Sequence, residues 1–248
     1  MTELVHYAVA DAVATITLDS PHNRNALSRQ LVTELFEHLG SAAADDEVRV
    51  VLIASAGNVF CSGADLSEAT ADGMEGGARR IVELQRLIVS LDKPVVVRAF
   101  GAVRAGGIGI VAASDIAIAN ESATFALTEV KLGLAAAIIS LTVHTRMNPR
   151  AAALTTLGGE VFGGADAAAY GLVTLAVPDD ELDERVAAVC RSLASGAPQG
   201  LRESKRILNA DLLQRIDAGG AEMAALSARL FASDEAREAM TAFLNRKK

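Results

Sequence analysis

Two glycine-containing loops stand where backbone amides could approach a bound ligand. They read "FCSGADL" over 60–66 and "RAGGIG" over 104–109, and each follows an apolar run. Small residues let a backbone N–H come close to a ligand, and the second loop leads into an apolar helical segment whose first amides are unpaired. Two amides that meet on one oxygen form an oxyanion hole, which stabilises an enolate or a tetrahedral anion. Taken alone, each loop is more typical of an ordinary turn, and neither fits a Walker A or dinucleotide-binding fingerprint.

The elements that must hold these loops alternate between apolar strands and amphipathic helices. Strands are expected in "LVHYAVADAVATITL", where two are joined at Ala10–Asp11, and in "VRVVLIASA", "VVVRAF", "DIAIAN" and "ATFAL". Ser28 is the expected N-cap of a helix that runs to about Ala43. A polar loop is expected to about Gly77, followed by a second amphipathic helix that ends at Lys93–Pro94. This alternation predicts an α/β fold built from repeated β-β-α units.

The C-terminal part of the chain has a different pattern. After about Lys131 the sequence becomes mostly helical, and strongly amphipathic helices are expected from near Gly196 to the basic end "FLNRKK". We therefore expect an α/β core over 1–195 and a helical C-terminal trimerisation region over 196–248, because amphipathic helices at a chain end often pack on a partner subunit.

Composition and charge exclude several classes of function. The 248 residues carry a net charge of −8, which argues against a nucleic-acid partner. No apolar run is long enough to span a membrane, and no signal peptide is recognisable at the N-terminus, so we expect a cytoplasmic protein without a membrane partner. Cys61 and Cys190 match no metal-ligand spacing, and we expect two buried thiols and no metal site.

Five motifs in order make the chain resemble the enoyl-CoA hydratase/isomerase (crotonase) superfamily. They are "SPHNRNAL", "VRVVLIASAGNVFCSGADL", "KPVVVRAFGAVRAGGIGIVAASDIAIA", "ATFALTEVKLGL" and "GADAAAYGLV", and the likeness covers essentially the whole chain. The resemblance implies a crotonase-like spiral of β-β-α units with a helical C-terminal appendage. It also implies an acyl-CoA substrate, no cofactor other than the coenzyme A of that substrate, and assembly as a homotrimer or a dimer of trimers.

The resemblance assigns roles to particular positions. The family's two oxyanion amides fall on Ala64 and Gly106, and Ala105 replaces the first glycine of the usual three-glycine turn. Hydratases of the family use two glutamates that together hold a water. One of them matches Glu129, whereas the other falls on Gly109, so the second acid is missing. Further substrate-binding positions are Arg24, Ala26, Ser62, Gly63, Asp65, Leu66, Gly107, Gly109 and Phe243.

A single carboxylate leaves the reaction open. Glu129 could pass a proton from water to Cα and so complete a hydration, and we take this as the first expectation. A similar turn and the segment after it resemble the 3-methylglutaconyl-CoA hydratase branch, in which a glycine at 109 would be a feature of the branch. Isomerisation of a β,γ double bond needs only one base, and a non-catalytic acyl-CoA-binding protein is the third possibility. Glu160, His144 and Asp65 are the candidates to replace the missing acid.

Overall fold

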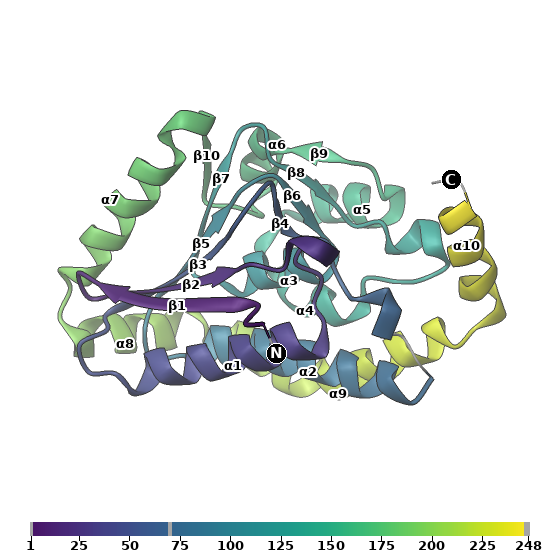
Figure 1. Ribbon diagram of the computed structural model, residues 1–248, viewed down its shortest axis with the longest axis horizontal. Helices are drawn as coiled ribbons and strands as arrows, with labels where there is room; N and C mark the ends of the chain where they lie inside the picture. The colour runs from purple at the N-terminus through teal and green to yellow at the C-terminus, as the bar shows by residue number, and fades with distance from the viewer. Residues whose placement is uncertain (1, 69–70, 246–248) are drawn as a thin grey trace.

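In the computed structural model, the described residues 2–68 and 71–245 form two β-sheets surrounded by helices (Figure 1). The side chains of residues 66, 71–74 and 243–245 lie outside the described part, and with them those of Leu66 and Phe243. Within that part, the helices are α1 (Arg29–Ala44), α2 (Ala71–Ser90), α3 (Gly106–Ala113), α4 (Ala137–Arg146), α5 (Pro149–Gly158), α6 (Gly164–Ala169), α7 (Leu182–Ala194), α8 (Pro198–Leu208), α9 (Ala210–Phe231) and α10 (Asp234–Asn245).

The larger sheet has six strands in the order β1-β2-β3-β5-β7-β10. Only the β1–β2 hairpin is antiparallel, and every later pairing in this sheet is parallel. The hairpin turns at Asp11 and Ala12, which both adopt positive φ. The strands of the larger sheet are β1 (Val5–Ala10), β2 (Val13–Leu18), β3 (Val50–Ser55), β5 (Val95–Ala99), β7 (Ile116–Asn120) and β10 (Leu175–Val177).

The smaller sheet has four short strands in the order β4-β6-β8-β9. These are β4 (Val59–Cys61), β6 (Ala102–Arg104), β8 (Thr124–Ala126) and β9 (Phe162–Gly163). The first three strands run parallel to one another, and β9 is antiparallel to β8. Three successive chain segments, β3-β4-α2, β5-β6-α3 and β7-β8-α4, therefore each place one strand in each sheet before a helix. This arrangement confirms the expected α/β spiral of β-β-α units.

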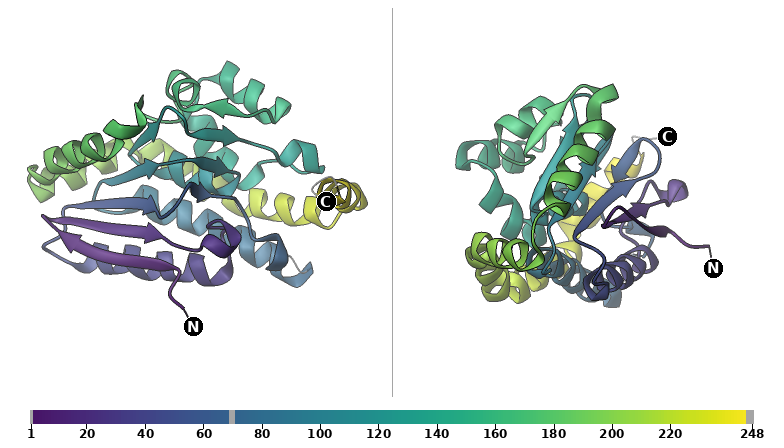
Figure 2. Two further views of the ribbon diagram at one scale, coloured as in Figure 1. Left: turned by 45° about the horizontal axis from the view of Figure 1, so that its top comes forward. Right: turned by 90° about the vertical axis from the view of Figure 1, so that its left-hand side faces the viewer.

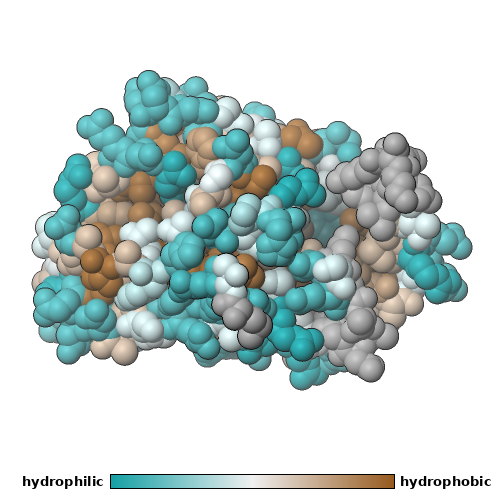
Figure 3. Space-filling model, in the orientation of Figure 1, coloured by the Kyte–Doolittle hydropathy of each residue, from teal (hydrophilic) through white to brown (hydrophobic). Residues whose placement is uncertain are grey.

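Alternation along the central strands explains the two hydrophobic layers. Val51 and Val97 belong to the main core on the side of α1, α2 and α3, whereas Val50 and Val96 face α7 and pack on its Leu182 and neighbours. Both faces of a central parallel strand are thus covered, as expected of continuous apolar runs. The two turned views show α7 on one side of the larger sheet and the long helices on the other (Figure 2). On the face shown in Figure 3, apolar groups are scattered between hydrophilic ones.

Two expectations about individual elements were wrong or incomplete. The loop expected to extend to about Gly77 is already helical from Ala71, so α2 is longer than its apolar periodicity suggests. The strands β4, β6 and β9 have only two or three residues, and their sequences are too short to show a period. Tertiary pairing, rather than local propensity, makes them strands.

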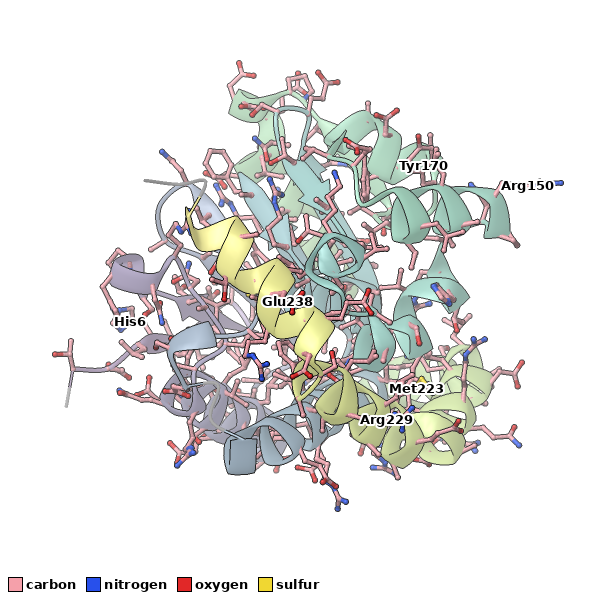
Figure 4. The ribbon with its side chains drawn as sticks, turned by 90° about the vertical axis from the view of Figure 1, so that its right-hand side faces the viewer. His6, Arg150, Tyr170, Met223, Arg229 and Glu238 are labelled. Carbon is pink, nitrogen blue, oxygen red and sulfur yellow. The ribbon has the colours of Figure 1, made fainter. Side chains whose placement is uncertain are left out.

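The C-terminal helices α8 and α9 pack on the rest of the same chain. Leu212 and Ile216 of α9 belong to the main core, and Arg86 of α2 pairs with Asp217 at 2.6 Å. At the start of α10, Ala236 lies against Gly133, where an added Cβ would be 3.2 Å from its Cα. Figure 4 looks onto α10, which carries Glu238, with Met223 and Arg229 of α9 below it. The trimerisation role of 196–248 stays a prediction.

Candidate active site

Three turns meet at one edge of the smaller sheet, because the parallel strands β4, β6 and β8 all end there. Cys61 of β4 pairs with Val103 of β6, and Arg104 pairs with Ala126 of β8. Ala64, Gly106 and Glu129 each follow these paired residues by two or three positions. The carboxyl ends of parallel strands are the usual place for a binding site in an α/β protein. The topology therefore gathers the three predicted catalytic positions.

The first two turns touch each other. A Cβ added to Gly63, whose φ is +97°, would lie 2.8 Å from the Cβ of Ala105. Leu27 contacts both turns: it forms a parallel bridge with Ala64, and its Cδ1 would lie 2.7 Å from a Cβ at Gly106. Neither the Ala64 amide nor the Gly106 amide donates a hydrogen bond to an acceptor in the described part of the chain. Two amides with unused N–H groups thus lie on either side of one leucine.

Ala105 holds the second turn in a strained conformation. Its φ of 46° and ψ of −119° fall in a region that favours glycine, and it is the residue immediately before α3. Strain of this kind persists where the surrounding structure imposes it, commonly at functional sites. The consequence is that Gly106 begins α3 with its amide at the positive end of the helix dipole.

Glu129 is the acidic group of the site. It begins a short 3-10 helix, η3 (Glu129–Leu132), three residues after the end of β8 at Ala126. Its Oε2 is buried and has no hydrogen-bond partner among the described residues. Burial raises the pKa of this carboxyl to about 7, and a hydrogen bond from its own backbone opposes the shift. A carboxyl with this pKa can both accept and donate a proton near neutral pH.

The position of the missing second acid is filled by other side chains. A Cβ added to Gly109 would lie 2.6 Å from Cγ2 of Ile139 and 3.3 Å from the amide end of Gln85. The buried Gln85 amide donates to the carbonyl oxygen of Ile138 at 3.0 Å, and its Oε1 accepts from the Thr142 hydroxyl at 2.7 Å. This side chain is committed to joining α2 to α4. The structure leaves no room for a carboxylate at position 109.

The three candidates to replace the missing acid are occupied elsewhere or exposed. Asp65 accepts from Asn23 at 2.9 Å and from Ser67 at 2.6 Å; burial alone would raise its pKa, but these hydrogen bonds outweigh it and lower the pKa. Glu160 pairs with Lys131 at 2.8 Å on the surface. His144 lies at the surface. The part of its ring that is shielded from water, and then the positive charge of Arg215, lower its pKa. Glu129 is therefore the one predicted acid with an unused buried oxygen.

A network of hydrogen bonds fixes the loop that contains Arg24 and Ala26 to the first glycine loop. The Leu27 amide donates to the Gly63 carbonyl at 2.8 Å, and the Ser62 amide donates to the Arg24 carbonyl at 3.1 Å. Asn25 donates to the Val59 carbonyl at 2.8 Å. The Arg24 side chain is exposed, whereas Ala26 is buried. Sequence reasoning missed the asparagines of "HNRNAL" as the residues that shape this loop, although their density was a signal.

A cavity of about 430 Å³ opens beside Ala64, between α1, α2 and α9. Its walls are mainly apolar, with arginine, serine, threonine and carboxylate groups among them. They comprise Leu27, Ser28, Arg29, Val32, Thr33, Ala64, Asp65, Glu68, Gly76, Gly77, Ala78, Arg80, Ile81, Ile138, Ser227 and Phe231. The volume suits a small organic ligand. Glu129, Gly106, Gly107 and Gly109 are not part of these walls, so the cavity adjoins the three turns on the Ala64 side.

The remaining predicted residues have structural surroundings. Gly107 is buried, and a Cβ there would lie 2.7 Å from that of Cys61. Arg104 donates to the carbonyls of Thr124 and Val103 beside the turn, so its guanidinium is committed to the sheet edge. Burial raises the pKa of the Cys61 thiol to about 12 and that of the Cys190 thiol to about 11, which confirms two buried thiols. None of the described helices has the length and hydropathy needed to cross a membrane.

Fold and site together define a crotonase-like α/β protein, in whose described part the Ala64 and Gly106 amides and a carboxyl with a buried Oε2 follow the parallel strands of the smaller sheet. Residues 8–248 match the sequence model described as enoyl-CoA hydratase/isomerase, and the chain belongs to this family.

Similar proteins cover nearly the full chain. A crystal structure of an enoyl-CoA hydratase from Mycobacterium avium is 45% identical over 99% of this chain and 98% of its own, with a TM-score of 0.93. A Bacillus subtilis protein named "Probable enoyl-CoA hydratase" is 31% identical over 98% of this chain and 96% of its own length. The human mitochondrial enoyl-CoA hydratase domain-containing protein 3 is 30% identical over 96% of this chain and 80% of its own.

Proposed function

We propose that this protein is an enoyl-CoA hydratase that works with a single carboxylate. Its substrate is an α,β-unsaturated acyl-CoA thioester, the amides of Ala64 and Gly106 bind the thioester oxygen, and Glu129 is the acid and base. The observation that carries this proposal is the Glu129 carboxyl, which has a buried Oε2 without a hydrogen-bond partner in the described part of the chain and a pKa raised by burial to about 7. The names of the similar proteins support hydration as the reaction.

The proposed reaction moves one proton through Glu129. The ionised carboxylate takes a proton from water while the water oxygen bonds to Cβ, and the electrons of the double bond move toward the thioester carbonyl. The amides of Ala64 and Gly106 stabilise the resulting enolate oxygen, with the dipole of α3 adding to the effect. Glu129 then returns the proton to Cα, which completes the addition of water and restores the carboxylate.

Isomerisation is the second candidate, and the packing at position 109 favours it. Because Ile139 and Gln85 fill that place, no carboxylate at position 109 can help to hold a water. Transfer of a proton from Cα to Cγ needs no water and only one base. The same two amides and Glu129 would serve an enoyl-CoA isomerase.

The cavity beside Ala64 is the proposed place of the acyl chain. Coenzyme A would pass the loop of Arg24 and Ala26 and the turn at Ser62, Gly63 and Asp65, as the family resemblance implies. It enters as part of the substrate, and no separate cofactor is proposed. The homotrimer or dimer of trimers, and a role for Phe243 toward a neighbouring subunit, are proposals that the resemblance supports.

Two unsaturated substrates distinguish the reactions. The purified protein is given 2-enoyl-CoA and 3-enoyl-CoA esters of several chain lengths, and the absorbance of the conjugated thioester is followed. We expect loss of the chromophore from 2-enoyl-CoA, which reports hydration; growth of the chromophore from 3-enoyl-CoA would report isomerisation instead. Replacement of Glu129 by glutamine should lower kcat by about 10²–10⁴-fold, the usual worth of an acid–base group. Its affinity for a saturated acyl-CoA should persist.

Two results would contradict the proposal that this protein is an enzyme. One is no change of absorbance with either ester at any chain length, while acyl-CoA still binds. The other is a residual activity that E129Q leaves unchanged. Both would favour a non-catalytic acyl-CoA-binding protein.

A further inference from the structure

The helix that begins at the proposed oxyanion amide is buried along its whole length. All eight residues of α3 are buried and none carries a charge. Its first amide, that of Gly106, has no acceptor in the described part of the chain, so its N-terminal end is free to meet an anion. The carbonyl groups at its C-terminal end need partners as well, because a buried helix end without partners is costly.

Arg146 provides those partners. This residue ends α4, and its Nε donates to the Ala112 carbonyl at 3.0 Å, while its Nη2 donates to the Ser114 carbonyl at 3.1 Å. The planar guanidinium thus bridges two carbonyls at the C-terminal end of α3. It holds this geometry through a third contact, since Nη2 also reaches Oδ1 of Asn209 at 3.3 Å. Asn209 precedes the first residue of α9.

The charge of Arg146 is only partly balanced. The acidic group that acts on it is Asp115, which raises its pKa against the stronger lowering by burial. Asp115 is shared: its Oδ2 lies 2.8 Å from Nζ of Lys205, and its Oδ1 accepts from Asn209 at 2.7 Å. Lys205 is also buried and donates to the Ile88 carbonyl at 2.9 Å. Two cations therefore share Asp115 at this end of α3.

The geometry gives this cation an effect at the other end of the helix. Eight residues at about 1.5 Å per residue place the Gly106 amide about 12 Å from the carbonyls that Arg146 binds. A helix carries partial negative charge at its C-terminal end, and the guanidinium cancels it. An anion at Gly106 then meets the positive end of the dipole without the opposing charge behind it. Through buried protein with an effective dielectric constant of about 20, a unit charge at about 12 Å changes a rate by about tenfold.

We propose that Arg146 is a positioning residue for the oxyanion site: it fixes the C-terminal end of α3 and increases the positive potential at the Gly106 amide. This inference rests on the proposed function, because it needs a thioester oxygen at Gly106. Arg146 touches no substrate, and it acts only through α3.

The stretching frequency of a bound thioester carbonyl reports the electrostatic potential at the Gly106 amide. Hexanoyl-CoA labelled with carbon-13 at the thioester carbonyl is not consumed by hydration, and its stretching frequency falls when hydrogen bonds and a positive potential polarise the carbonyl. We expect binding to the wild type to lower this frequency. In Arg146→Gln part of the shift should be lost and kcat should fall about tenfold with KM nearly unchanged. Arg146→Lys keeps the charge and should retain most of the shift.

Two further variants separate potential from damage to the fold. Arg86→Gln removes the ion pair that links α2 and α9, away from α3, and should leave the frequency unchanged. Asp115→Asn removes the anion that opposes Arg146 and should shift the carbonyl frequency further down, which general loosening would not do. If Arg146→Gln fails to fold, the direction of the Asp115→Asn shift decides the question.

The outcomes are distinguishable. An unchanged frequency in folded Arg146→Gln, an equal change in Arg86→Gln, or an upward or absent shift in Asp115→Asn would overturn the role of Arg146 and leave the proposed function standing. Failure of the wild type to bind hexanoyl-CoA, or binding without any carbonyl shift, would overturn the proposed function and this inference with it.

Discussion

Glu129 shows how a single side chain can be costly to the fold and useful to the site. Its carboxyl has a buried Oε2 that finds no hydrogen-bond partner among the residues that the structure describes. Proteins seldom retain such a group unless function requires it. Burial without an opposite charge is also the cause of its raised pKa. The same environment that makes Glu129 an effective base should therefore weaken the folded state when the group ionises.

The pH dependence of activity and of stability should both report Glu129. A step that needs the ionised base should make kcat/KM rise with pH and level off above about 7. Stability should change in the opposite direction. Below the ordinary pKa of 4.5 the group is protonated in both states and has no effect, whereas between 4.5 and about 7 the folded state loses free energy.

The variant Glu129→Gln isolates the effect of Glu129 ionisation on the free energy of unfolding. Because each pKa unit corresponds to about 1.4 kcal/mol, the variant should be more stable than the wild type by about 3 kcal/mol at pH 8, and the difference should shrink toward zero near pH 4. Urea unfolding at the two pH values measures it. Stability curves that run parallel over this range would show that Glu129 is not desolvated in solution.

At the scale of elements, the packing of α3 against α2 and α4 decides which acids the site can contain. Gly109 of α3 meets Ile139 of α4 and Gln85 of α2 at distances that exclude a Cβ without movement. Such overpacking in a dense core usually costs stability. The glycine is thus matched by its neighbours, and the single-carboxylate site is a property of three helices together.

Restoring the family's second acid should therefore fail. Gly109→Glu is expected to destabilise the protein by about 1–3 kcal/mol and to give no gain in hydration. Adding Ile139→Ala should recover part of the stability by making room. Thermal unfolding and the chromophore assay measure both effects. Gly40→Glu is the matched control, because a Cβ there meets nothing within 4 Å; a Gly109→Glu protein as stable as this control would contradict the packing argument.

Small residues on α2 should set the length of the acyl chain. Ala78 is buried and forms part of the wall of the cavity, with Gly76 and Gly77 before it. Ala78→Phe should fill the cavity and lower kcat/KM for decenoyl-CoA much more than for crotonyl-CoA. Ala43→Phe, at an exposed position of α1, should change neither value. Equal losses for both esters in Ala78→Phe would place the acyl chain elsewhere.

At the scale of the whole molecule, one group of exposed apolar side chains lies on and beside α5. Leu154, Leu157 and Val161 are 64%, 75% and 58% exposed, and Val130 of η3 is 42% exposed. α5 also contacts η3, so this surface adjoins the segment that contains Glu129. Exposed apolar groups of this kind often mark an interface, which agrees with the predicted homotrimer or dimer of trimers.

The assembly prediction can be tested at this surface. We expect light scattering to give the mass of three or six chains, and Leu157→Glu should shift the distribution toward smaller species because it places a charge in an apolar contact. Val9→Glu on β1, where the side chain is 42% exposed and which lies outside the predicted trimerisation region 196–248, is the control and should assemble normally. A wild-type protein with the mass of one chain would refute the predicted assembly.

Much of the fold could be predicted because it depends on long, periodic segments. The runs that became β3, β5 and β7 are apolar on both faces, and Ser28 does cap α1, accepting from the Leu31 amide at 3.3 Å. In the second sheet, β8 was expected from the run "ATFAL", whereas β4, β6 and β9 gave no such signal. Their pairing partners lie about 20 to 40 residues away along the chain, and that information is absent from any local window.

For this protein, the sequence by itself determined the family, the α/β class, the two glycine loops and the presence of Glu129 without an acid at position 109. These follow from residue types in order, and residue types are what a sequence contains. Only the tertiary structure decided that β4, β6 and β8 gather the three turns, that Ile139 and Gln85 fill the place of a second acid, and that Arg146 closes the far end of α3. Each of these depends on contacts between distant segments, and burial and electrostatic potential arise only from such contacts.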